Sequence, residues 1–137
     1  MRSSRPGRAH RPDAGERASA SVEFALVLPL ILMLAMALVQ VALLAKDQLV
    51  VTGAARAGAR QAAVSTDDAA VRQAVVDEAV SLDPSRLEVA VERLGGIGTA
   101  ASVSVRHQAP IVVSLVRWLF DGDVPLSATA SMRQETE

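Results

Sequence analysis

The hydrophobic and polar positions along the chain form one long apolar run followed by shorter periodic stretches. Residues 24–45 contain no charged side chain and are interrupted only by Pro29 and Gln40. A helix of this length extends roughly 33 Å at about 1.5 Å per residue, close to the hydrocarbon thickness of a bilayer. The alternative is a buried core helix, but the rest of the chain is too short to surround one. The run therefore predicts a transmembrane helix over residues 24–45.

The helix is expected to continue beyond the membrane, through "KDQLVVTGAARAGARQAAV" (residues 46–64). Small residues recur there at four-residue spacing, which lets another helix approach closely. These helix-packing residues are Ala54, Ala55, Gly58 and Ala59. Arg56 and Arg60, also four apart, share a different, charged face. Two interpretations stay open: the small face packs against the chain's own domain, or it packs against another subunit.

Four further patterns predict the remaining elements. Thr66 and the two aspartates after it are typical of a helix N-terminus, and residues 67–82 place apolar side chains on one face before Asp83-Pro84 ends the helix. Apolar and polar residues alternate in "RLEVAVERL", in "ASVSVRH" and in "PLSATASMRQ", which predicts three strands, the first two joined by the turn "GGIGT" as a hairpin. The predicted fold class is α+β: a long N-terminal transmembrane helix, a second helix and a small antiparallel three-stranded sheet.

The stretch Pro110–Asp123, between the second and third strands, has two interpretations. It is too short to span a bilayer. It could form a helix whose residues Trp118 and Phe120 rest against a membrane surface or a partner, or it could be a connection packed on the sheet.

Composition and charge add an orientation. Half of the 137 residues are hydrophobic but only 2% are aromatic, the net charge is −1, and there is no cysteine, so we expect neither disulfides nor a nucleic-acid partner. Residues 1–18 are rich in Arg, Gly and Pro and are expected to be disordered as an isolated segment. Five arginines precede the apolar run, namely Arg2, Arg5, Arg8, Arg11 and Arg17. The positive-inside rule therefore predicts a cytoplasmic N-terminus, with residues 46–137 outside.

Candidate catalytic residues are few. The two histidines, His10 and His107, lack the spacing of a helix-borne metal site, and "GGIG" lacks the pattern of a dinucleotide-binding loop. There is no P-loop and no nucleophile elbow. Paired carboxylates such as Asp121 and Asp123 are typical of solvated loops. We therefore expect no enzyme activity, no cofactor and no metal.

A secretory signal peptide is one interpretation of the N-terminus, with "AMA" (residues 35–37) as its cleavage site. The apolar stretch, however, continues for eight residues after Ala37, whereas the apolar region of a signal peptide ends near the cleavage site. Glu23 also stands where that apolar region would begin. These features argue against a signal peptide.

The stretch "RASASVEFALVLPLILML" (residues 17–34) resembles the N-terminus of the TadE-like minor pseudopilins of tight-adherence (Flp-type) pilus systems. Family members carry a basic leader, a small residue, four residues, then Glu-Phe-Ala-Leu and an early proline. Ala18 holds the small position, which is usually Gly, and Glu23, Phe24 and Pro29 follow. "AARAGARQAA" (residues 54–63) is similar to a second family segment, whose glutamate is replaced by Ala57. "LSATASMRQE" resembles the family's C-terminal strand.

The resemblance implies processing by a prepilin peptidase between Ala18 and Ser19, and an assembly role for Glu23, Phe24 and Pro29. It implies a cleaved basic leader at 1–18, a long helix at 19–64 and an extracytoplasmic α+β domain at 65–137. The implied partners are the prepilin peptidase, other pilins or pseudopilins, an inner-membrane secretion platform and membrane lipid. The implied location is the bacterial cytoplasmic membrane, and after assembly a surface pilus. The rival function is an anchored extracytoplasmic binding module that does not enter a filament.

Overall fold

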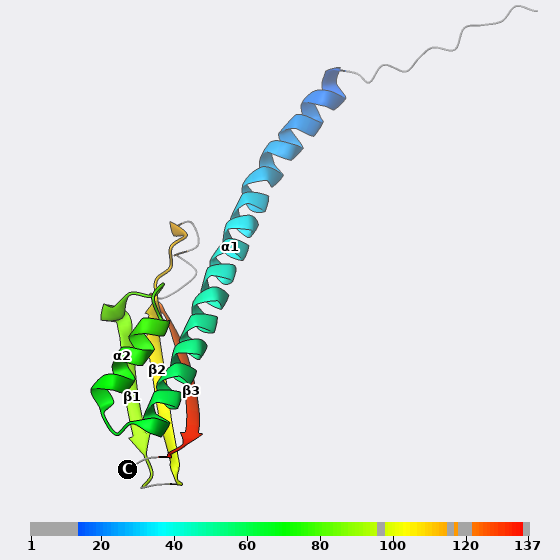
Figure 1. Cartoon of the computed structure of the whole chain (residues 1–137). Helices are drawn as coiled ribbons and strands as arrows, with labels where there is room; N and C mark the ends of the chain where they lie inside the picture. Colours follow the sequence, from blue (N-terminus) through cyan, green and yellow to red (C-terminus); the bar gives the residue numbers. More distant parts are fainter. Residues whose placement is uncertain (1–13, 96–97, 115–116, 118–121, 136–137) are drawn as a thin grey trace, which may run out of the picture. The chain divides into compact units, whose positions relative to one another are not determined.

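A computed structural model describes residues 14–95, 98–114, 117 and 122–135. The described residues form the elements drawn in Figure 1. These are α1 (Ala14–Val64), α2 (Asp68–Glu78), the 3-10 helix η1 (Pro84–Arg86), β1 (Leu87–Arg93), β2 (Ala100–Ala109) and β3 (Val124–Arg133). The predicted α+β class is confirmed. The chain divides into two compact units, Met1–Ala35 and Met36–Glu137, and α1 contributes to both.

The first unit contains the N-terminal part of α1. The helix begins at Ala14, within the segment that we expected to be disordered. Ala14, Glu16, Arg17 and Ala18 are residue types of moderate to high helix propensity, which suits a helical start here. Regular structure therefore reaches back into the predicted leader; residues 1–13 lie outside the described part. Pro29 lies inside α1, where it removes one backbone hydrogen bond of the helix.

One helical segment of the described chain, Ser19–Val64, is long and apolar enough to cross a membrane. Only 6% of its most apolar window of 18 residues is buried. Large side chains such as Leu26 and Leu30 are 75% and 66% exposed. A core helix of a soluble protein would cover these side chains. The structure is thus consistent with a single-pass membrane anchor.

The second unit contains a three-stranded antiparallel sheet in the order β1-β2-β3. The register pairs Val89 with Val105 and Val105 with Ala128, so the apolar residues of all three strands share one face. On the opposite, exposed face the Ser104 and Thr129 hydroxyl oxygens lie 2.8 Å apart. The predicted strands and the hairpin of β1 and β2 are confirmed.

The core of the second unit lies between the inner face of the sheet and the two helices. It is built from small and β-branched side chains rather than aromatic ones, which lets the helices approach the sheet closely. Its fully buried members include Val51, Ala54, Ala59 and Ala62 of α1, Val71 and Val75 of α2, and Val103 and Val105 of β2. The second half of α1 is therefore part of the domain core.

The boundaries of the second helix differ from the prediction. Asp67, not Thr66, is the N-cap residue, and its side chain accepts a hydrogen bond from the backbone N–H of Ala69. The helix ends at Glu78, four residues before the predicted end. Ala79 and Leu82 are nevertheless buried, because the turn that follows continues to cover the core. Burial extends the apolar pattern beyond the helix, which explains the overestimate.

Candidate processing and assembly site

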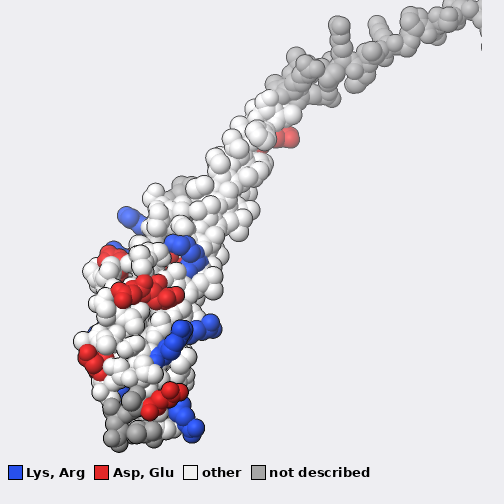
Figure 2. Space-filling view, in the orientation of Figure 1, with Lys and Arg blue, Asp and Glu red and all other residues white. Residues whose placement is uncertain are grey.

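The bond between Ala18 and Ser19 lies near the start of α1, and Glu23 lies one helical turn after Ser19. The Glu23 side chain is exposed and forms no ion pair with any residue that the structure describes. Phe24, next to it, is 63% exposed. Among the described residues, most of the charged side chains coloured in Figure 2 belong to the second unit. From Ser19 to Ala35, Glu23 is the only charged residue.

The small face of α1 is buried within the second unit. Ala54, Ala55 and Ala59 are at most 1% exposed, and Gly58 is buried as well. A Cβ atom added to Gly58 would lie 2.6 Å from Val75 Cγ2 and 3.0 Å from Val103 Cγ1. The close approach that the small residues permit is thus made to α2 and β2 of the same chain. In this structure the face is used inside the domain.

The charged face of α1 stays open. Arg56 and Arg60 are exposed and line a groove of ≈ 560 Å³. The other residues of the groove are Gly53, Ala57, Gln61 and Val64 of α1 and Glu78 of α2. Neither arginine forms an ion pair within the described part of the chain. Ala57, which lies between the two arginines in the sequence, has no carboxylate that could neutralise them.

Gln40 has a structural role that sequence reasoning missed. Its Oε1 accepts hydrogen bonds from the backbone N–H groups of Val112, at 3.1 Å, and Val113, at 3.0 Å. The side chain is 1% exposed, and its Nε2 has no hydrogen-bond partner among the described residues. The sequence offered one sign of this role: Gln40 is the only amide side chain in the uncharged run of 22 residues.

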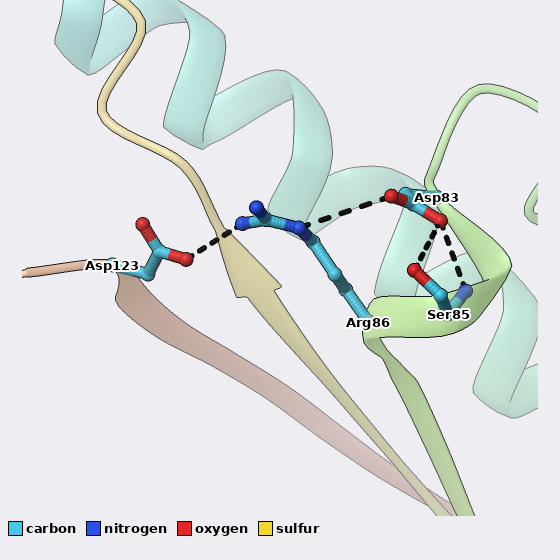
Figure 3. A network of polar contacts seen from close by, with 4 residues as sticks. All are labelled: Asp83, Ser85, Arg86 and Asp123. Carbon is cyan, nitrogen blue, oxygen red and sulfur yellow. Dashed lines mark hydrogen bonds and ion pairs between the residues drawn. The ribbon is translucent and has the colours of Figure 1, made fainter.

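Val112 and Val113 belong to the connection between β2 and β3. A polar network holds the other end of this connection (Figure 3). Arg86 of η1 forms an ion pair of 2.6 Å with Asp123, the residue before β3, and a longer one of 3.8 Å with Asp83. The Ser85 side chain and backbone N–H both donate hydrogen bonds to Asp83. These two bonds hold the pKa of the Asp83 carboxyl below its ordinary value, and the Arg86 charge acts in the same direction. The network ties the start of β3 to the start of β1.

Comparison with known proteins identifies the N-terminal part of the chain. Residues 18–60 match the family of TadE-like proteins. The TadE-like segment includes Ala18, Glu23, the small face and both arginines of the groove. The resemblance predicted from the sequence is confirmed over these residues, and it indicates a protein related to Tad pilus systems. No curated protein and no solved structure matches the chain.

Proposed function

We propose that this protein is a minor pseudopilin that takes part in the assembly of tight-adherence pili. The observation that carries the proposal is the TadE-like segment at residues 18–60, in which Glu23 stands exposed at the start of an uncharged apolar helix. Before assembly, the helix anchors the protein in the bacterial cytoplasmic membrane, with its N-terminus in the cytoplasm. The role is structural, without catalysis, cofactor or metal.

In this proposal the prepilin peptidase cleaves the bond between Ala18 and Ser19. Cleavage removes the five arginines that precede the apolar run and creates an ammonium group on Ser19, four residues before Glu23. A charge at the centre of a membrane costs about 2.5–3.5 kcal/mol on insertion scales, and one near the edge costs less. Glu23 is therefore tolerated at the cytoplasmic border of the membrane.

Assembly changes the surroundings of Glu23. In a filament, the carboxylate would lie among the Val, Leu and Ile side chains of neighbouring helices, where an unpaired charge is unfavourable. The Ser19 ammonium of an adjacent subunit would pair with it there. Phe24, already exposed, would pack between helices, and Pro29 would let the helix bend because one backbone hydrogen bond is missing.

The partners follow from this sequence of events. They are the prepilin peptidase, other pilins or pseudopilins, the inner-membrane secretion platform and membrane lipid. The small face is buried inside the domain and is not accessible to a partner. We therefore assign contact with another pilin to the exposed groove of Arg56 and Arg60. Two unpaired cations one helical turn apart suit an acidic segment of that pilin.

Two measurements test the proposal. N-terminal sequencing of the mature protein should find Ser19 as its first residue. Glu23→Gln keeps the size and removes the charge, so the variant should be inserted and processed while the number of pili falls. Glu88→Gln changes an exposed carboxylate of β1 and should leave piliation unchanged. Normal piliation with Glu23→Gln, or a mature chain that begins near Leu38, would contradict the proposal.

A further inference from the structure

Gln40 lies near the outward end of the apolar run, six residues before Lys46, the first charged residue after it. At roughly 1.5 Å per residue, Gln40 is about 9 Å deeper than Lys46 along the helix axis. The headgroup region on each side of a bilayer is only about 5–8 Å thick. Gln40 therefore lies on the hydrocarbon side of the headgroups, within the predicted span of residues 24–45. Its neighbours Val39 and Val41 are 47% and 59% exposed, as expected for lipid-facing residues.

The start of the connection between β2 and β3 lies beside Gln40 of α1, because Gln40 accepts hydrogen bonds from the backbone of Val112 and Val113. These residues are not helical. Non-helical backbone near hydrocarbon is unfavourable unless its N–H groups are satisfied by the protein. Gln40 satisfies two of them with one oxygen, and Pro110 has no N–H group to satisfy. Gln40 thus removes the need for water at the N–H groups of Val112 and Val113.

The outward side of this connection suits lipid. Val112 is 68% exposed, whereas Ile111 is 9% exposed and holds the segment to the domain. Arg117, further along, is exposed and lines a small cavity with Arg86, Pro110 and Asp123. A guanidinium next to an apolar surface can bind the phosphates of lipid headgroups. The ion pair between Arg86 and Asp123 fixes the return of the chain to the sheet.

We propose that the segment 110–113 rests in the membrane leaflet nearest the domain, and that Gln40 is the residue that positions it there. The occupant of this apolar surface is lipid, because Val112 is held at Gln40, whose neighbours Val39 and Val41 are exposed on the anchor helix. The domain would then contact the membrane at two places, the helix and this connection. The inference rests on the single-pass anchor and not on pilus assembly.

The chain has no cysteine, so single-cysteine variants can report depth without first removing a native cysteine. Full-length Val112→Cys, labelled with an environment-sensitive fluorophore, is placed in phosphatidylcholine–phosphatidylglycerol vesicles. We expect quenching by spin-labelled lipids and at least a threefold weaker response to aqueous iodide than that of labelled Leu94→Cys. Leu94, the residue after β1, is 81% exposed. A Val112 label that responds like the Leu94 label would overturn the proposal.

Gln40→Met tests the positioning role, because it keeps the length of the side chain and removes the acceptor. In the Val112→Cys background it should abolish most of the quenching by lipid. Gln48→Met is the matched control: Gln48 of α1 donates to the backbone oxygen of Ser127 in β3, away from the connection. This control should keep the quenching. Unchanged quenching in Gln40→Met would overturn the role of Gln40.

Two further outcomes are separable. The label of Val39→Cys should be quenched by lipid. If it is not, the membrane anchor is disproved and this inference with it, whereas the piliation assay tests assembly independently.

Quenching at Val112 should not change with the protein-to-lipid ratio. Loss of both lipid and iodide quenching at a high ratio would mean that a second copy of the chain covers this surface, and would overturn the assignment to lipid.

Discussion

At the scale of single residues, two glycines of α1 have opposite surroundings. A Cβ atom on Gly53 would meet Glu78 Oε1 at 3.5 Å, an ordinary contact, whereas one on Gly58 would meet Val75 Cγ2 at 2.6 Å. Both glycines are helical, so replacement by Ala gains the same backbone propensity, about 1 kcal/mol. Their difference therefore isolates the close packing of the small face.

We predict that Gly58→Ala is less stable than Gly53→Ala by about 1–3 kcal/mol in the free energy of unfolding, the usual cost of overpacking a core. Gly53→Ala should be slightly more stable than the wild type. The measurement is pulse proteolysis of the full-length protein in detergent across a urea series. Equal midpoints for the two variants would show that the face near Gly58 is not packed within the domain.

The candidate residues that could be found from the sequence are those marked by a local pattern of residue types. Glu23 is conspicuous as a charge before an apolar run, and the small residues are conspicuous by their spacing. That spacing shows only that something approaches closely; it does not say whether this is another subunit or the chain's own sheet. The role of Gln40 was beyond prediction, because its partners are backbone N–H groups 72 and 73 residues away. Such groups leave no mark in side-chain patterns.

At the scale of elements, α1 has different sides in the second unit, a buried small face and an exposed one with Arg56 and Arg60. The periodicity of the sequence separates these faces, as predicted. It located the end of α2 less well, because Ala79 and Leu82 continue the apolar pattern in a turn that is no longer helical. The apolar pattern therefore reports which residues are buried and does not show whether they are helical.

The open arginines of this element give a prediction. The double variant Arg56→Glu/Arg60→Glu reverses the charge of the groove without entering the core, so the domain should fold. Its recovery with other pilins of the same system, after cross-linking and purification, should fall at least fivefold, because an acidic partner segment would be repelled. Arg72→Glu, an exposed charge reversal on α2, should leave recovery near the wild-type value. Equal recovery of both variants would remove the groove from the interface.

At the scale of the whole molecule, anchor and domain share one helix. The sequence suggests a boundary after residue 64, where the helix ends, yet the second compact unit begins at Met36. The buried face of α1 belongs to the domain core although it continues the helix of the apolar span; its residues are Val51, Ala54, Ala55, Ala59 and Ala62. Helical periodicity is the same in lipid and against a sheet, so the sequence could not show where one environment gives way to the other.

Orientation is the property of the whole chain on which the proposed function depends. Five arginines precede the apolar run, whereas Lys46, Arg56 and Arg60 are spread over the fifteen residues after it. From this difference the positive-inside rule predicts a cytoplasmic N-terminus. A reporter enzyme that is active only outside the cytoplasm should therefore be active when fused after Glu137. The same reporter fused after Ala18, without the apolar run, should be inactive. Replacing the five leader arginines by Gln should lower the activity of the Glu137 fusion, because the charge difference that sets the orientation is lost. An inactive Glu137 fusion that is stably expressed would reverse the topology, and it would place the domain where it could not join a surface pilus.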